Sequence, residues 1–330
     1  MKVALITPAV GRARNGNRNT AYRWASFLRE LGHAVRVERD WSGARADLMI
    51  ALHARRSHAS IRAYAERFPE HPLVVTLTGT DLYRDIKIDA DAQESLALAT
   101  RLVVLHELGA LALPARYRPK THVIVQSAHR AAAPKPLSTC FEVCVSGHLR
   151  EEKDPFRAAA ALRFVPEESR VCVTHMGGAL SAAMAAQARA WMKREPRYRW
   201  VGERPHAQAL RLLARSRLMV ISSRMEGGAN VVCEALAAGI PVIASRIPGN
   251  VGMLGTRYPG YYTFGDEREL ARLITRAERD AAYYRSLLRA CAARAPLVTP
   301  ERERAGLKTL VDAAVRAARV NRPSGAGATP

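Results

Sequence analysis

The sequence predicts an α/β protein made of two Rossmann-like, doubly wound domains that face each other across a cleft. Its 330 residues exceed the length at which one hydrophobic core usually keeps growing, so two domains are expected. Short apolar runs alternate with amphipathic helical stretches along the chain, which is typical of parallel sheets wrapped by helices. The alternation breaks at residues 131–136 (AAAPKP), where two prolines indicate a linker.

The N-terminal domain is expected to span residues 1–135. Helices are predicted at residues 19–31 and 57–68. Apolar or β-branched runs predict strands at residues 3–8, 34–38, 47–52, 73–79, 101–106 and 121–127.

The C-terminal domain is expected to span residues 136–300, with a helix at 301–320 that packs back on the N-terminal domain and a disordered tail at 321–330. Ligands of such sheets bind where strands end and helices begin, so the cleft is the expected binding place. Strands are predicted at residues 141–147, 170–178, 198–202, 218–223 and 241–245, and helices from 155, at 182–193, at 207–215 and from 267.

The formal net charge of +21 favours an anionic ligand without identifying it. The basic residues are mostly arginines spread along nearly every predicted helix. No recognition helix, zinc finger or aromatic-interleaved basic module accompanies them, so nucleic acid is not the expected partner. A basic nucleic-acid-binding protein without catalysis stays open as an alternative.

The first ten residues, MKVALITPAV, form too short an apolar run for a secretory signal, and no later run approaches the roughly 20 residues of a spanning helix. A cytoplasmic protein without a membrane span is expected. Five scattered cysteines, an odd number, argue against a disulfide framework and for reduced thiols. Cys140 and Cys144 are expected on one face of a strand as small core residues. No metal or other cofactor is expected.

The most informative stretch is residues 222–248, SSRMEGGANVVCEALAAGIPVIASRIP, which follows a predicted strand and opens a helix. Glu226 ends a loop, and Glu234 follows eight residues later in the first turns of that helix. The glycines between them let the backbone approach a ligand, and the helix start offers N–H groups to negative charge. Carboxylates accept hydrogen bonds from hydroxyls, so this arrangement suits a sugar, a diphosphate and a ribose.

EGGANVVCEALAAGIPVIAS resembles the Glu-x7-Glu signature of family 4 glycosyltransferases, which have the GT-B fold. The resemblance implies that Glu226 contacts the donor sugar and Glu234 the nucleotide ribose. Segment 201–223 is similar to the segment beside the nucleotide base in that family, which implies a role for Gly202. The resemblance further implies a donor-binding set between the two acids, made of Gly227, Gly228, Ala229 and Asn230.

Residues 145–155, VSGHLREEKDP, resemble the diphosphate-binding turn of the same family. Lys153 matches the lysine that the family places there, and Arg150 is expected to act with it. Charge-assisted contacts to departing phosphate oxygens stabilise a leaving group, so both are candidate catalytic residues with Glu226. His148 stands where the family usually has an arginine, so its role in the donor site stays open.

Three N-terminal loops at predicted strand ends, residues 11–19, 53–57 and 78–81, are expected to face the cleft. Their arginines suggest a small, strongly anionic acceptor, because guanidinium groups match phosphate oxygens in pairs. His53 and Asp81 are the candidates for a base or for an oxocarbenium stabiliser. The full expected acceptor set is Gly16, Asn17, Arg18, Arg55, Arg56, Thr80 and Asp81.

Four motifs together resemble the selenosugar synthases of the selenoneine pathway, which are relatives of family 4 glycosyltransferases: GNRNTAYRWASFLRELGH, DLMIALHARRS, VVTLTGTDLYRD and GHLREEKDPFRAA. The resemblance implies a reaction between selenophosphate and a UDP-sugar, typically UDP-N-acetylglucosamine, that forms a carbon–selenium bond. An ordinary family 4 glycosyltransferase with a carbohydrate or lipid-linked acceptor, and a nucleotide-sugar epimerase, stay open as alternatives.

Overall fold

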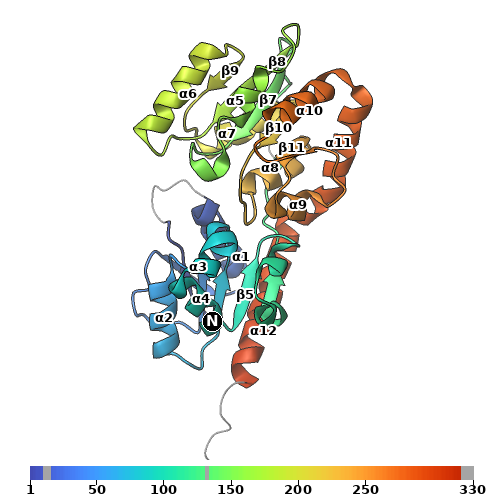
Figure 1. Ribbon diagram of the computed structural model, residues 1–330. Coiled ribbons are helices and arrows are strands. Elements are labelled where there is room, and N and C mark those ends of the chain that lie inside the picture. Colours follow the sequence, from blue (N-terminus) through green and yellow to red (C-terminus); the bar gives the residue numbers. More distant parts are fainter. Residues whose placement is uncertain (10–15, 131–133, 321–330) are drawn as a thin grey trace, which may run out of the picture. The chain divides into compact units, whose positions relative to one another are not determined.

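The computed structural model describes residues 1–9, 16–130 and 134–320. Most of the predicted 11–19 loop, half of the predicted 131–136 linker and the predicted tail at 321–330 lie outside the described residues. The chain divides into two compact units (Figure 1). Unit 1 contains Met1–Gln126 and the C-terminal residues from Glu301, and unit 2 contains Ser127–Pro300.

Unit 1 is built on a six-stranded parallel sheet in the order β2-β1-β3-β4-β5-β6. The reversal of direction after β2 is the doubly wound pattern that the alternating sequence predicted. The strands are β1 (Lys2–Ile6), β2 (Ala34–Glu38), β3 (Leu48–Leu52), β4 (Leu73–Thr76), β5 (Arg101–Val104) and β6 (Thr121–Val123). The helices are α1 (Gly16–Glu30), α2 (His58–Arg67), α3 (Ile86–Ile88), α4 (Ala90–Leu98) and α12 (Pro300–Val320), with single-turn helices η1 (Asp81–Asp85), η2 (Gly109–Ala112) and η3 (Ala115–Lys120).

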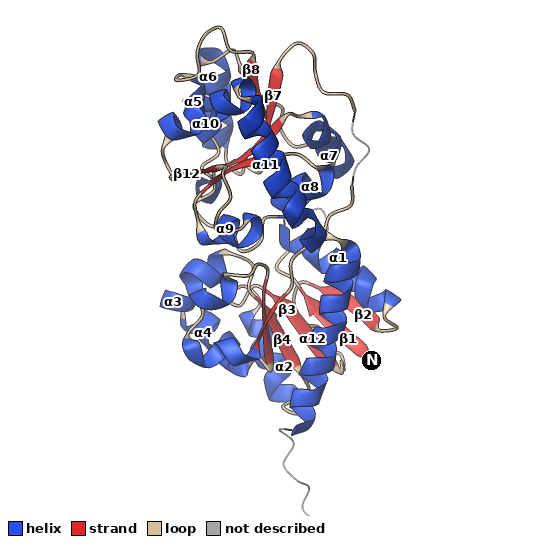
Figure 2. Cartoon of the chain, turned by 90° about the vertical axis from the view of Figure 1, so that its right-hand side faces the viewer, coloured by secondary structure: helices blue, strands red, loops and turns tan. Residues whose placement is uncertain are grey.

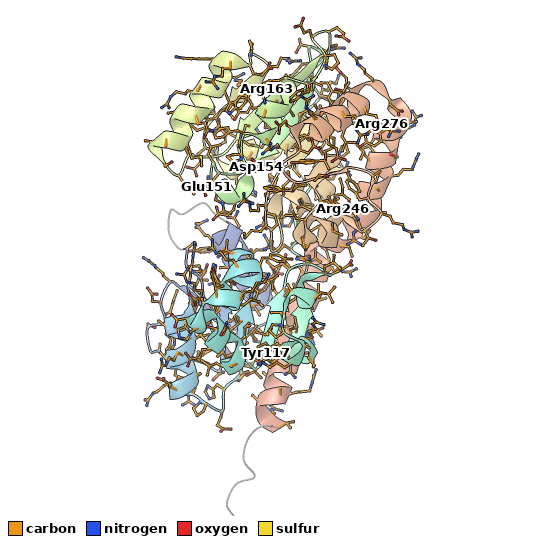
Figure 3. The ribbon with its side chains drawn as sticks, viewed as in Figure 1. Tyr117, Glu151, Asp154, Arg163, Arg246 and Arg276 are labelled. Carbon is orange, nitrogen blue, oxygen red and sulfur yellow. A yellow bond between two sulfur atoms is a disulfide. The ribbon has the colours of Figure 1, made fainter. Side chains whose placement is uncertain are left out.

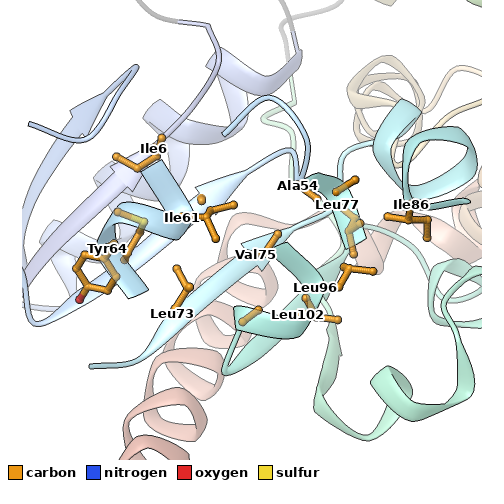
Figure 4. Close-up of a cluster of buried hydrophobic side chains, with 14 of the residues drawn as sticks. Ile6, Ala54, Ile61, Tyr64, Leu73, Val75, Leu77, Ile86, Leu96 and Leu102 are labelled. Atoms are coloured by element: carbon orange, nitrogen blue, oxygen red, sulfur yellow. The ribbon is translucent and has the colours of Figure 1, made fainter. Parts of the chain in front are cut away.

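Two hydrophobic cores lie on opposite faces of the unit 1 sheet. Figure 4 shows the first, in which Ile61 and Tyr64 of α2 and Leu96 of α4 pack on strand residues such as Val75. The second joins α1 to α12, and Figure 2 shows α12 in front of the strands. Because both faces are covered, β3 is buried at every position, as expected for a central parallel strand.

A buried carboxylate fastens α12 to α1. Glu303 is 1% exposed and accepts hydrogen bonds from Trp24 Nε1 at 2.7 Å and from Arg23 Nε at 2.8 Å. These partners compensate the cost of taking the charge out of water. The chain therefore returns to unit 1 after leaving unit 2.

Unit 2 repeats the architecture with the strand order β12-β11-β10-β7-β8-β9, again all parallel. Its strands are β7 (Phe141–Ser146), β8 (Val171–Met176), β9 (Tyr198–Trp200), β10 (Leu218–Ile221), β11 (Val242–Ser245) and β12 (Tyr261–Tyr262). Its helices are α5 (Arg157–Leu162), α6 (Ala182–Arg194), α7 (His206–Arg215), α8 (Asn230–Ala238), α9 (Pro248–Leu254), α10 (Glu267–Arg279) and α11 (Ala281–Arg294), with η4 (Glu151–Lys153) and η5 (Ala295–Val298).

The prediction of five reduced thiols is wrong in this structure. Cys140 and Cys172 form a disulfide, with Cα atoms 6.1 Å apart, while Cys144, Cys233 and Cys291 are free and buried. The reason is register: β7 and β8 are neighbours, which brings the two residues together across a separation of 32 in sequence. Spacing along the chain gave no sign of this pairing.

The predicted start of the first helix is three residues late. Helix α1 begins at Gly16, so Gly16, Asn17 and Arg18 form its first turn instead of a loop. Thr20 Oγ1 donates to Gly16 O at 2.9 Å within that turn. Glycine and asparagine are poor helix formers, and their presence moved the predicted boundary inward. None of the described helices is long and apolar enough to cross a membrane.

Replacing Glu303 by Ala is expected to lower the free energy of unfolding by about 3 kcal/mol, because Arg23 and the Trp24 indole lose a buried partner. Urea denaturation measures the change. Arg304→Ala is the matched control, since Arg304 joins the same two helices through an exposed ion pair with Glu30 at 3.1 Å. The control should lose less than about 1 kcal/mol. Equal losses in the two variants would show that Glu303 is not the anchor.

Candidate functional site

Glu226 lies in the loop between β10 and α8 and is 7% exposed. Its carboxylate accepts a hydrogen bond from Ser223 Oγ at 2.5 Å and forms an ion pair with Lys153 Nζ. A buried carboxylate is costly without such partners. The structure therefore brings two of the predicted donor-site residues into direct contact.

A second serine fixes the turn that carries Lys153. Ser222 Oγ lies 3.0 Å from Lys153 O and 2.8 Å from Asp154 O, the two carbonyls that can accept its hydrogen bond. Asp154 has φ of 44°, in the left-handed region, and its carboxylate pairs with Arg157 at 2.8 Å. Figure 3 labels Asp154 beside Glu151 at this turn. The ends of β7 and β10 are thereby held together, although 73 residues separate Lys153 from Glu226.

Residues at the end of β11 and just after it support the backbone of the Glu226 loop. Ser245 Oγ donates to Ser223 O at 2.7 Å, and Asn250 Nδ2 donates to Ser245 O at 2.9 Å. Helix α9 approaches so closely that a Cβ on Gly249 would lie 2.0 Å from Glu226 O. Sequence reasoning missed Ser245, Gly249 and Asn250; the only signal was their place in the SRIPGN stretch, which begins at the last residue of a predicted strand.

The Gly147 turn is locked to the end of β8. Gly177 has φ of 150°, and a Cβ there would lie 1.9 Å from Gly147 O. His148 Nδ1 accepts a hydrogen bond from Gly178 N at 3.1 Å, and His175 Nε2 donates to Gly147 O at 3.1 Å. Only glycine permits this close approach of two backbones.

One small pocket is lined by residues from both turns, including Gly147, His148, Lys153 and Ser223. Gly202, with φ of 72°, lies beside it, because its carbonyl accepts the Gly177 N–H at 2.9 Å. Arg150 precedes η4 and is exposed, and it does not line this pocket. The structure thus groups His148, Lys153 and Glu226 closely and leaves Arg150 at the surface.

Glu234 lies in the second turn of α8, away from Glu226 in the hydrogen-bond network. Its Oε1 lies 2.9 Å from Nε2 of His206, the first residue of α7, which is hydrogen-bond distance. Two glycines, residues 227–228, join Glu226 to Ala229. Ala229 is the N-cap residue of α8, and its side chain makes no capping hydrogen bond. Asn230 opens the helix, whose first N–H groups carry the positive end of the helix dipole.

In unit 1, Asp81 organises the loops at the carboxyl ends of β3 and β4. It is fully buried, and its two oxygens accept backbone N–H groups of Ala54 at 3.0 Å, Thr78 at 2.8 Å and Gly79 at 2.8 Å. Three backbone donors occupy both oxygens of this carboxylate. This geometry makes Asp81 a positioning residue for both loops.

His53 adopts a φ of 76° directly after β3, a strained conformation for a residue with a Cβ. Its Nδ1 accepts the Arg56 N–H at 3.3 Å, so its Nε2 carries the proton and donates to Thr80 Oγ1 at 3.1 Å. Burial lowers the pKa of His53, and the nearby Asp81 carboxylate only partly opposes this. His53 is therefore a neutral imidazole that joins two predicted acceptor loops.

The predicted acceptor arginines have different environments. Arg55 forms an ion pair of 2.8 Å with Asp89, whereas Arg56 is exposed and has no ion pair with the residues that the structure describes. The Arg18 guanidinium lies over the Tyr22 ring, 4.6 Å from its centroid. Arg56 is thus the more available of the 55–56 pair.

Sequence reasoning missed Tyr83 and His106, which lie in unit 1 after β4 and β5. Their rings stack, and the Tyr83 hydroxyl lies 2.7 Å from His106 Nε2. Burial lowers the pKa of His106 to about 4, so the imidazole is neutral. Their position at strand ends was the available signal, since RLVVLH ends in this histidine.

Each unit is doubly wound around a parallel sheet, and unit 2 has an acid pair beside a basic turn. These features define a GT-B type protein. Residues 131–295 match the model of the group 1 glycosyl transferases. The chain belongs to the group 1 glycosyl transferase family. A glycogen synthase of Mycobacterium tuberculosis is 33% identical over 125 residues, which are 36% of this chain and 29% of that protein. The chain therefore matches less than a third of this relative.

Solved structures confirm the predicted fold class. Anabaena HepE, in complex with UDP and glucose, aligns with a TM-score of 0.76 at 17% identity, over 94% of this chain and 99% of that one. The sucrose-phosphate synthase of Thermosynechococcus elongatus aligns with a TM-score of 0.75 at 15% identity, over 94% and 98%. At these identities the likeness concerns the fold.

The burial of His175 predicts a pH dependence of stability. Its pKa is lowered to about 4 by burial, while the unfolded chain binds this proton near pH 6.5. The unfolded state therefore takes up the proton first, and the free energy of unfolding should fall as pH falls from 6.5 towards 4, by up to about 1.4 kcal/mol per pH unit.

Urea denaturation between pH 7 and pH 5 should show a shallower slope for His175→Gln than for the wild type. The exposed His129 provides the matched variant, His129→Gln, whose slope should equal that of the wild type. An unchanged slope in His175→Gln would remove this residue as the cause.

Proposed function

We propose that the protein is a glycosyltransferase that moves the sugar of a UDP-sugar, expected to be UDP-N-acetylglucosamine, to selenophosphate. In this reaction the bond between the anomeric carbon and the diphosphate oxygen breaks, and UDP leaves with the bonding electrons. Selenium supplies the lone pair for the new carbon–selenium bond. Family membership supports sugar transfer, and the four motifs of the resemblance support the selenium acceptor.

The contact between Lys153 and Glu226 is the observation that carries the proposal. In the free protein each charge is the partner of the other. An incoming sugar diphosphate offers both of them replacements: phosphate oxygens for Lys153 and sugar hydroxyls for Glu226. Ser223 keeps the carboxylate in place during this exchange.

The remaining donor contacts follow from the same turn. Arg150 is exposed and is proposed to reach the diphosphate when the donor is bound. The start of α8, after the glycine pair, suits phosphate oxygens, and Glu234 with His206 suits the ribose hydroxyls. Stabilising the negative charge of departing UDP is the main catalytic contribution that these groups offer.

On the acceptor side, Arg56 and the first turn of α1 are proposed to hold the phosphoryl oxygens of selenophosphate. Because the selenium nucleophile is already an anion, the reaction needs little help from a base. This fits a buried Asp81 that is occupied by backbone donors and a neutral His53 that positions Thr80. Both then shape the acceptor loops without removing a proton.

A carbohydrate acceptor is the second candidate. The match of 125 residues to a glycogen synthase favours it, as does the likeness in fold to HepE, whose structure holds UDP and glucose. The acceptor decides between the two, since both use the same donor site.

Incubation with UDP-N-acetylglucosamine is expected to release UDP only when selenophosphate is added. Coupled detection of UDP and mass spectrometry of the selenosugar measure the reaction. UDP release with a sugar acceptor and none with selenophosphate would favour the second candidate. Strong, salt-dependent DNA binding without any UDP release would overturn both.

Glu226→Gln is expected to lower kcat by about 100-fold or more, because the amide cannot replace the charge that Lys153 and the sugar require. Steady-state UDP release measures kcat. Glu151→Gln, an exposed change in the same turn region, should keep wild-type turnover. Circular dichroism confirms that both variants are folded. Wild-type turnover in Glu226→Gln would remove this residue from the site.

A further inference from the structure

A second pocket lies in unit 2, between α7 and the sheet edge formed by β8 and β9. Its volume is about 660 Å³, and it shares no lining residue with the pocket of His148 and Lys153. This size is in the range of pockets that hold small molecules. It is therefore a separate candidate binding site.

One wall is a stripe of α7. Gln208, Arg211 and Arg215 line the pocket at spacings of three and four residues, and Arg204 precedes them by four. Residues at these spacings lie on one face of a helix. The other wall is the sheet, where Thr174 pairs in register with Arg199 and presents its side chain on the same face.

The acid in the pocket is already neutralised. The Glu142 carboxylate accepts two hydrogen bonds of 2.8 Å from Arg215 and one of 2.8 Å from Thr174 Oγ1. Arg197, also in the lining, is occupied by Glu195 at 2.9 Å. Both carboxylates, Glu142 and Glu195, are thus already paired with an arginine and do not pair with the other arginines of the pocket.

Three lining arginines keep their charge available. Arg199, Arg204 and Arg211 are exposed, and none has an ion pair with a residue in the described ranges 1–9, 16–130 and 134–320. Three like charges around one concavity attract a counter-anion strongly. Guanidinium groups bind phosphate oxygens in pairs, so a dianionic phosphate matches this set.

The lining also contains apolar side chains, Val173, Val201 and Leu212. They offer contact to the carbon part of a ligand, which inorganic phosphate lacks. We propose that this pocket binds a small phosphate monoester, with Arg199, Arg204 and Arg211 on the phosphate and the apolar side chains on its organic part. Helix α7 carries this stripe and, at its start, the His206 that pairs with Glu234, so the two sites share one helix.

Protection from phenylglyoxal, which modifies exposed arginines, tests the proposal residue by residue. The full-length protein is labelled at constant ionic strength with increasing inorganic phosphate or glycerol 3-phosphate in place of chloride, and the sites are quantified by mass spectrometry. Arg199, Arg204 and Arg211 should be protected together with one midpoint, and glycerol 3-phosphate should protect at a lower concentration. Arg285 and Arg289, exposed on α11, should stay reactive.

Arg199→Gln should raise the phosphate concentration that half-protects Arg211 by about tenfold, because one of three charges is lost. Arg285→Gln removes the same charge elsewhere and should leave that midpoint unchanged. Equal labelling of the pocket arginines with and without phosphate would overturn the proposal. Equal protection of Arg285 and Arg289 would also overturn it, since it would reflect net charge alone.

Discussion

The predicted donor site of unit 2 depends on how the fold accommodates the buried carboxylate of Glu226. A carboxylate that is only 7% exposed needs hydrogen bonds and a counter-charge. The hydrogen bond and the counter-charge come from the ends of two different strands. Parallel strands make this possible because all their carboxyl ends meet at one edge of the sheet. Ser223 at the end of β10 and Lys153 after β7 reach the same carboxylate, since β7 and β10 are neighbours in the sheet.

In unit 1 the partners of the buried carboxylate are of a different kind, and this difference suits the two carboxylates to different roles. Asp81 is saturated by three backbone N–H groups, which fix two loops and cannot be exchanged for a ligand. Glu226 is paired with a lysine side chain, which can swing to a phosphate. A carboxylate held by side chains is suited to binding, whereas one held by backbone is suited to shaping a loop.

Much of the architecture could be predicted from the sequence. The six strands of unit 1 and five of the six in unit 2 followed from apolar or β-branched runs. The signal is continuous where a parallel strand is buried on both faces, as in β3. Strand β12, with two residues, is too short to leave one. The acids and Lys153 were visible because their spacing resembles a known signature. Ser223, Ser245 and Asn250 were not visible, because their roles depend on neighbours in space.

The same limit applies to the disulfide and to the basic pocket. Cys140 pairs with Cys172 because β7 and β8 are neighbours in the sheet. Arg199 and Arg211 come together because β9 and α7 line the same pocket. In the sequence, these arginines could not be told apart from the others that give the chain its charge of +21. The structure distinguishes them by their partners. Arg215 and Arg197 form ion pairs with the buried acids Glu142 and Glu195, whereas the exposed arginines of the pocket have no ion pair with a described residue.

The histidine at position 148 shows what one departure from the family pattern changes. Its Nδ1 accepts the Gly178 N–H at 3.1 Å, so this side chain joins the Gly147 turn to the end of β8. An arginine at this position would add a permanent charge to the pocket that Lys153 lines. Lys153, which also lines that pocket, has its charge balanced by Glu226. Under the proposed function, a diphosphate therefore has to be attracted by further basic residues near this turn, and Arg150 is exposed there.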